Sequence, residues 1–182
     1  MYVRQLYYAH RFDLMNIDTE NNTMRMRSCD GRGYTKLNKF YFYNIPEEMT
    51  MAGEFYISND GVLYIYKTDD FDGGNITVSA MKDNLIHIDG VSNVTIDNLT
   101  LQDCNATGIV GYADALTVKN CTIRDVYSAI LMSGGHNIKI HANTLYNLLS
   151  HGVDLYNGYG QYSLEPMNNE ITYNELYNFA IN

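Results

Sequence analysis

The chain has 182 residues, 46% of them hydrophobic, and a folded chain of this size buries roughly 70% of the surface that its unfolded form exposes. The formal net charge is −9, with 12 Lys and Arg residues against 21 Asp and Glu residues, which disfavours a nucleic-acid partner. No stretch approaches the roughly 18 apolar residues of a membrane span, and the three cysteines lack the spacing of a zinc site. We therefore expect no membrane partner, metal or cofactor. The first residues lack the apolar run of a signal peptide, so these residues predict no compartment.

Residues 1–82 alternate apolar and polar side chains in the manner of β-strands. The alternation runs through YVRQLYYAHRF from Tyr2 and through KFYFYNI from Lys39. A third segment, GEFYISNDGVLYIYK from Gly53, has an Asn-Asp-Gly sequence at residues 59–61, which favours the tight turn of a hairpin. We predict a small antiparallel β-module over this part of the chain.

The second half of the chain repeats itself. Three segments align without gaps, namely NVTIDNLTLQD from Asn93, ALTVKNCTIRD from Ala115 and NIKIHANTLYN from Asn137. The start points are 22 residues apart, and a fourth copy, NEITYNELYN from Asn169, follows an insertion of about nine residues. A period of this length is typical of a solenoid whose rungs stack on one another.

Each copy contains two short strands with one buried face, because apolar residues alternate along it. The strands meet at a bend at Asn98 and Asn120, since asparagine tolerates the left-handed conformation of a sharp corner. In the later copies we expect this bend to shift by one residue, to Asn143 and Asn174. A third strand follows in every rung, and its inward residues are predicted to stack as a column: Ile109, Ile130, Val153 and Ile181.

These features predict an all-β fold, a right-handed parallel β-helix of about four rungs over residues 83–182, preceded by the antiparallel module. A leucine-rich repeat has a similar period, but its Leu-rich consensus is missing here. The sequence stops inside a strand, at Ile181 and Asn182, without a visible cap over the sheet edge. We expect the chain to be a fragment or its last rung to be covered by another chain, including end-to-end self-association through uncapped rungs.

A family resemblance is carried by four segments: VRQLYYAHR from Val3, GEFYISNDGVLYIY from Gly53, NLIHIDGVSNVTIDNLTL from Asn84 and HGVDLYNGYGQYSLEPMNNEITYNELYNF from His151. Their order resembles bacterial β-helix proteins of the pectin-lyase-like superfamily, and is most similar to glycoside-hydrolase-type members in which a small β-module interrupts the first rungs. The resemblance implies a polysaccharide or oligosaccharide partner and an extracellular or periplasmic location. In those relatives an acidic Asp-x-Gly-Ala type segment in later rungs belongs to the active site, and this sequence contains no such segment.

Glycoside hydrolysis commonly needs two carboxyl groups, about 5 Å apart for retention or about 6.5–9.5 Å apart for inversion of configuration. The outward residues of the predicted third strand are Val110, Leu131, Asp154 and Asn182, so Asp154 is the one acid in that column. The insertion that follows contains Glu165, which would reach back as the second catalytic carboxyl group.

Substrate-binding side chains are predicted around Asp154. Aromatic faces suit the C–H groups of a sugar ring and amides suit its hydroxyl groups, and we assign this role to His151, Tyr156, Tyr159, Gln161 and His136, with His136 lining a cleft above His151. The alternative interpretation is a long surface loop with ordinary solvated acids.

Asp103 and Asp125 form a second pair of acids, one rung apart in the repeat. Two stacked carboxylates can perturb each other's pKa and so mark a functional site. Both residues fall near a bend, however, where aspartate usually caps a turn. We favour the structural role.

Three functions remain open from the sequence. The first is a glycoside hydrolase, or part of one, acting on a neutral glycan. A lyase acting on polyuronates would need basic residues, and residues 83–182 contain only Lys119, Arg124 and Lys139. The second is a non-catalytic glycan-binding β-helix, and the third is a structural scaffold segment.

Overall fold

The computed structural model describes residues 2–4, 9–27, 39–67, 69–71, 78–156 and 167–180. The chain divides into two compact units, Met1–Asn75 and Ile76–Asn182. No helix in the described part of the chain is long and apolar enough to cross a membrane.

The first unit consists of small antiparallel sheets, as predicted. One sheet has the strand order β2-β1-β5, and two hairpins pair β3 with β4 and β6 with β7. The elements are β1 (Tyr2–Arg4), β2 (Ala9–Arg11), β3 (Leu14–Asp18), β4 (Thr23–Met26), β5 (Lys39–Tyr41), the 3-10 turn η1 (Pro46–Glu48), β6 (Phe55–Ile57) and β7 (Leu63–Ile65). Phe12 is buried here, and Met26 and Phe42 pack against it.

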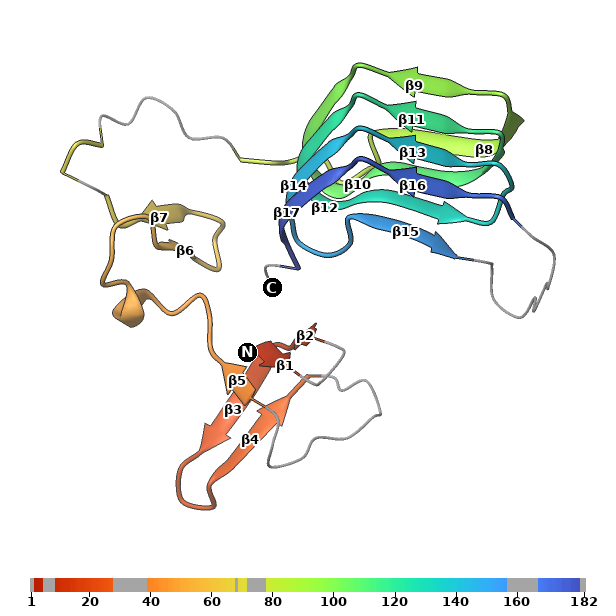
Figure 1. Cartoon of the computed structure of the whole chain (residues 1–182). Helices are drawn as coiled ribbons and strands as arrows, with labels where there is room; N and C mark the ends of the chain where they lie inside the picture. The colour runs from red at the N-terminus through yellow and green to blue at the C-terminus, as the bar shows by residue number, and fades with distance from the viewer. Residues whose placement is uncertain are drawn as a thin grey trace. The chain divides into compact units, whose positions relative to one another are not determined.

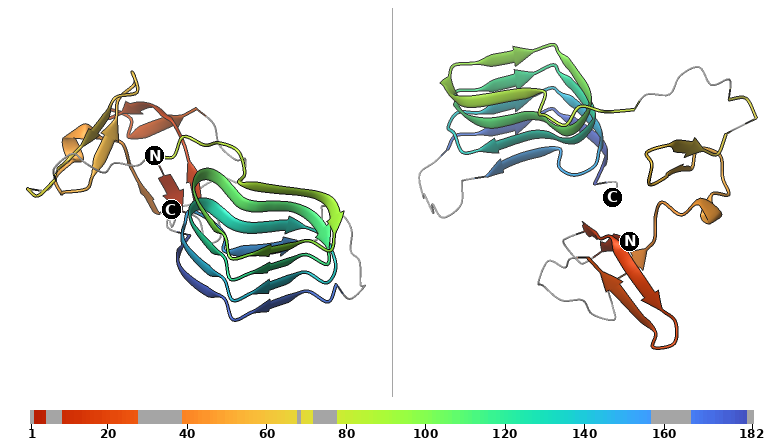
Figure 2. Two further views of the ribbon diagram at one scale, coloured as in Figure 1. Left: turned by 90° about the horizontal axis from the view of Figure 1, so that it is seen from above. Right: turned by 180° about the vertical axis from the view of Figure 1, so that it is seen from behind.

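The second unit is a parallel β-helix (Figure 1). Its strands are β8 (Ile86–Ser92), β9 (Thr95–Asp97), β10 (Thr100–Asp114), β11 (Thr117–Lys119), β12 (Thr122–Ser133), β13 (Lys139–His141), β14 (Thr144–Leu148), β15 (Val153–Tyr156), β16 (Glu170–Thr172) and β17 (Glu175–Phe179). The first strands of successive rungs form a sheet in the order β16-β13-β11-β9, which closes three full turns. The second and third strands share one larger sheet, because β10 and β12 each run through both of them. The predicted fold is confirmed, and Figure 2 shows the stacked rungs from two further sides.

The corner between the first and second strands keeps its place in every rung. Asn98 and Asn120 adopt the left-handed conformation as predicted, with φ of 57° and 52°. In the later rungs Ala142 and Tyr173 occupy the corner, with φ of 51° and 56°. The predicted one-residue shift of the bend is therefore wrong, and no small insertion is present.

Asn143 follows that corner and turns its side chain into the coil, where it is 1% exposed. Its Oδ1 accepts a hydrogen bond from the backbone N–H of Cys121 at 2.9 Å, and its Nδ2 donates to the carbonyl oxygen of Val118 at 3.0 Å. Asn174 repeats this pattern one rung later toward Asn143 and Ile140. The asparagines therefore satisfy backbone groups inside the coil, which explains polar residues at inward positions.

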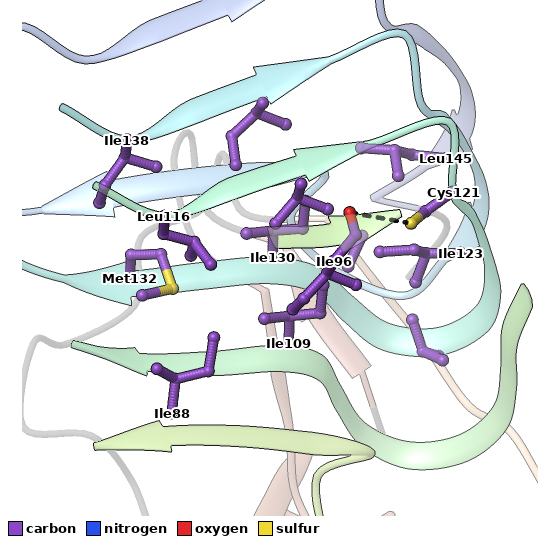
Figure 3. Packing of buried hydrophobic residues seen from close by; sticks show 14 of the residues in the cluster. Ile88, Ile96, Ile109, Leu116, Cys121, Ile123, Ile130, Met132, Ile138 and Leu145 are labelled. Carbon is purple, nitrogen blue, oxygen red and sulfur yellow. Dashed lines mark hydrogen bonds between the residues drawn. The ribbon is translucent and has the colours of Figure 1, made fainter. Parts of the chain in front are cut away.

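The interior of the coil is one continuous cluster of apolar side chains, which stack in columns from rung to rung (Figure 3). Ile109 and Ile130 are fully buried and lie in register with each other, as predicted for the third strand. Val153 continues the column beside Ile130 and is partly buried, whereas Ile181 lies outside the described residues. Each inward residue thus excludes water from the residues above and below it in the same column. This burial of apolar surface is the main stabilising term of the fold.

In the last described rung the inward residues are exposed. Ile171, Leu176 and Phe179 are 52%, 38% and 51% exposed, although their register partners in the preceding rung are fully buried. The end-to-end association expected from the sequence stays a prediction.

Candidate functional site

The outward face of the third strands carries two of the residues predicted to bind or cleave a glycan, Asp154 and Tyr156. The pleat places alternate residues on this face, and the parallel register stacks them in two columns across the rungs. One column contains His87, Val110, Leu131 and Asp154, and the other contains Asp89, Tyr112, Ser133 and Tyr156.

Asp154 lies at the centre of β15 as a partly buried residue. Leu131 is its neighbour in the preceding rung, and Tyr156 follows two residues later on the same face. Within the described part of the chain the Asp154 side chain makes no hydrogen bond and no ion pair. Its carboxylate is therefore available to a ligand, whereas the carboxylates of Asp97, Asp114 and Asp125 accept hydrogen bonds.

Two tyrosines on this face offer exposed aromatic surface. Tyr112 is 44% exposed and Tyr156 is 37% exposed. A Cβ on Gly134 would meet the Tyr112 ring at 3.2 Å, so this glycine allows the ring to lie close against the next rung. Tyr146 and Tyr177, on the second strands, stack on each other at 4.9 Å with an interplanar angle of 7°, so they cover each other's facing surfaces.

The structure does not bring His136 and His151 together. His151 lies at the start of the third strand, where its backbone N–H donates to the Ser128 hydroxyl at 3.3 Å. His136 follows the end of β12, the third strand of the preceding rung. Ser128, which bonds to His151, lies about 16 Å before the last residue of that strand, Ser133, along an extended chain. The backbone N–H of His136 donates to Asp114 at 2.8 Å, and this bond lowers the pKa of the Asp114 carboxyl. The two histidines therefore adjoin opposite ends of neighbouring third strands, and the cleft over both stays a prediction.

Tyr159, Gln161 and Glu165 lie outside the described residues. Their predicted roles, including that of Glu165 as the second carboxyl group, stay predictions.

Asp89 is an acid on this face that the sequence reasoning missed. The alternation Ile86, His87, Ile88, Asp89 is the signal that identifies β8 as a third strand ahead of the first complete rung. Asp89 stands three rungs and two residues from Asp154, which corresponds to about 16 Å. That separation exceeds the range for a pair of glycosidase carboxyl groups.

Asp103 and Asp125 both adopt the left-handed conformation at the next corner, with φ of 61° and 52°. Gln102 donates to Asp103 at 2.7 Å, and Asn147 donates to Asp125 at 3.0 Å. Arg124 pairs with Asp125, whose hydrogen bond raises the pKa of the guanidinium group. These contacts agree with the structural role that we favoured for the two acids.

A comparison with known protein families shows the family of this chain. The model of the family described as "Right handed beta helix region" matches residues 60–182, which is more than half of the sequence. The chain belongs to this right-handed β-helix family. No curated protein and no solved structure matches the chain.

The three basic residues of the repeat region of this right-handed β-helix, residues 83–182, lie away from the third-strand face. Lys119 and Lys139, on the first strands, pair with Asp97 at 3.2 Å and with Glu170 at 3.6 Å. The third coil residue of this kind, Arg124, is on a second strand, and the outward positions of the described third strands carry no Lys or Arg. Among the described residues no group of three or more His, Cys, Asp or Glu side chains is placed to hold a metal ion.

Proposed function

We propose that this β-helix binds a neutral polysaccharide along the outward face of its third strands and hydrolyses it, with Asp154 as a catalytic carboxyl group. The observation that carries the proposal is the combination of a partly buried carboxylate at Asp154, which bonds to no described residue, with Tyr156 on the same strand face. A glycan laid along this face would meet aromatic surface at Tyr156 and Tyr112, two rungs apart or about 10 Å. That spacing accommodates a sugar ring at each tyrosine.

The chemistry requires a second carboxyl group, and we assign it to Glu165 in the insertion after β15. One of the two groups would protonate the leaving oxygen, and the other would attack the anomeric carbon or activate water, depending on their separation. Asp154 touches the substrate in either scheme. His151 and Gln161 would bind hydroxyl groups of the sugars next to the cleaved bond.

Charge supports a neutral glycan as the substrate. Asp89 and Asp154 both lie on the proposed face, so a polyuronate would bring further carboxylates toward two like charges. β-Elimination of a uronate also needs a base to remove the α-proton and cations to neutralise the carboxylate. The described third-strand face provides no such cation.

A non-catalytic glycan-binding module is the second candidate function. It is favoured by the distance of about 16 Å between Asp154 and Asp89, the other acid on the described face. Such a module would bind through Tyr112 and Tyr156 without turnover.

The test is the release of reducing ends from a panel of neutral plant and mucin polysaccharides, measured for the wild type, Asp154→Asn and Asp89→Asn. We expect turnover that Asp154→Asn reduces by at least about a thousandfold, the scale on which loss of a catalytic group acts. The Asp89→Asn control keeps the fold and the face but should retain activity. Affinity electrophoresis in the same polysaccharides separates the two functions. Binding by all three proteins without turnover would reject hydrolysis and support the non-catalytic module.

A further inference from the structure

The first unit contains an open groove beside its β6–β7 hairpin, separate from the proposed glycan face. The hollow has a volume of about 820 Å³, and its lining includes Tyr41, Phe42, Tyr43 and Phe55. This size lies in the range of ligand sites, which are mostly apolar with a few polar groups. Figure 1 shows the hairpin and the η1 turn in the same unit.

Hydrogen bonds across the hairpin show which backbone groups of β6 point toward β7 and which point away from it. The N–H of Ser58 donates to the carbonyl oxygen of Val62 at 3.0 Å, and the N–H of Tyr66 donates to that of Glu54 at 2.8 Å. In an antiparallel pair the bonded residues alternate with residues whose backbone groups point outward. Residues 54, 56 and 58 therefore bond toward β7, and the backbone groups of the residues between them point away from β7.

Phe55 and Ile57 are the two residues on that outer edge, opposite Ile65 and Leu63. The N–H of Ile57 donates to Oδ1 of Asn44 at 2.8 Å, and its carbonyl oxygen accepts from Nδ2 of Asn44 at 2.8 Å. The side-chain amide thus bonds to the strand as the backbone of a neighbouring strand would. Phe55, two residues before Ile57, presents its N–H and carbonyl oxygen on the same edge. Within the described residues no hydrogen bond to these two groups is present.

The side chains along the groove define the chemistry of an occupant. Tyr41, Tyr43 and Phe55 are 50%, 44% and 60% exposed and provide apolar walls on both sides. Glu54 is held in place by the backbone N–H groups of residues 50 and 51 at 2.7 and 2.8 Å. The Glu48 side chain makes no hydrogen bond or ion pair among the described residues, and the lining contains no Lys or Arg. Apolar side chains and a cation would complement this lining.

We propose that the outer edge of β6 binds an extended peptide of a partner protein by β-strand addition. The peptide backbone would pair with the N–H and C=O groups of Phe55, in line with the amide of Asn44. Its alternate side chains would be apolar toward the aromatic walls, and one Lys or Arg would meet Glu48. Pairing at a free edge supplies affinity through backbone bonds and specificity through alternate side chains.

Fluorescence anisotropy with the full chain tests this site. The probe is a labelled, end-capped peptide that alternates Val and Thr and carries one Lys. Phe55→Pro removes the proposed N–H donor without touching a bond of the hairpin, since this residue lies at an unbonded pair. Leu63→Pro is the matched control, because it removes an outward N–H from the opposite edge of the same hairpin.

We expect saturable binding of the probe that Phe55→Pro weakens by at least roughly fivefold to tenfold, since it removes one net hydrogen bond and the Phe55 ring from the groove wall, and that Leu63→Pro leaves unchanged. A probe that is N-methylated along one edge should bind more weakly to the wild-type chain, which tests the pairing without any change to the protein. Absence of saturable binding, or equal losses in both proline variants, would overturn the proposal. Concentration-dependent dimers in sedimentation experiments, abolished by Phe55→Pro, would assign the edge to a second copy instead and would also overturn it.

Discussion

Replacement of Asn143 by leucine should destabilise the coil even though it puts an apolar side chain into an apolar interior. The substitution deprives the N–H of Cys121 and the carbonyl oxygen of Val118 of their partners. Both residues are 1% exposed or less, so water does not replace the amide. An unsatisfied buried polar group costs about 1–3 kcal/mol, which makes the loss for two groups about 4 kcal/mol at the middle of that range.

Burial of the leucine side chain offsets about 2 kcal/mol of this loss. We therefore expect the free energy of unfolding of Asn143→Leu to fall by about 2 kcal/mol, measured as a lower urea midpoint with an unchanged slope. Asn174→Leu is a second test of the same reasoning, since the Asn174 amide serves the N–H of Asn143 and the carbonyl oxygen of Ile140, residues that are 1% and 0% exposed. Its loss should also be about 2 kcal/mol. An Asn143→Leu variant as stable as the wild type would refute the conclusion that buried amides satisfy the coil backbone.

Three further predictions concern glycine packing, the amide column and acid stability. A Cβ at Gly111 would lie 1.8 Å from a backbone oxygen of the neighbouring rung, so Gly111→Ala should cost more than about 3 kcal/mol, whereas Gly90→Ala, in open space, should cost about 1–2 kcal/mol in the same urea assay. Cys121→Asn should raise the free energy of unfolding by about 1 kcal/mol, because it extends the amide column by one rung. The N–H of His136 lowers the pKa of Asp114, so the ionised carboxylate stabilises the fold fully above its unfolded pKa near about 4, and this contribution is lost as the pH falls through the lower folded pKa. Asp114→Asn should therefore flatten the stability profile below about pH 4, and an unchanged acid midpoint would contradict this assignment.

The repeat made the fold predictable. Asparagine, however, occurs at two adjacent positions of the rung, which made the predicted corner wrong in the later rungs. Asn98 and Asn120 occupy the bend itself, whereas Asn143 and Asn174 lie one position later with their side chains inside the coil. Asparagine serves both positions, since it tolerates the left-handed conformation and also satisfies a backbone donor and acceptor together. Residue type alone does not separate these roles, and the register between rungs does.

The candidate site was predicted in part for a similar reason. Asp154 was identified from its place in the outward alternation, and its neighbours Leu131 and Tyr156 follow from the same pattern. Asp89 was missed because its strand precedes the first complete copy of the repeat, where self-similarity is weakest. His136 and His151 adjoin opposite ends of neighbouring third strands, an arrangement that sequence spacing does not show.

The sequence by itself determined the rung of this protein, because a period of 2 residues within strands and of 22 residues between copies admits few folds other than a stacked coil. Only the tertiary structure decided which outward side chains share a face, which asparagines point inward, and that the outward backbone groups of Phe55 bond to no described residue beside an aromatic groove. These features depend on hydrogen-bond register between segments that lie 13 to 31 residues apart. A slip of one residue in that register would move every side chain to the opposite face without changing the local sequence pattern.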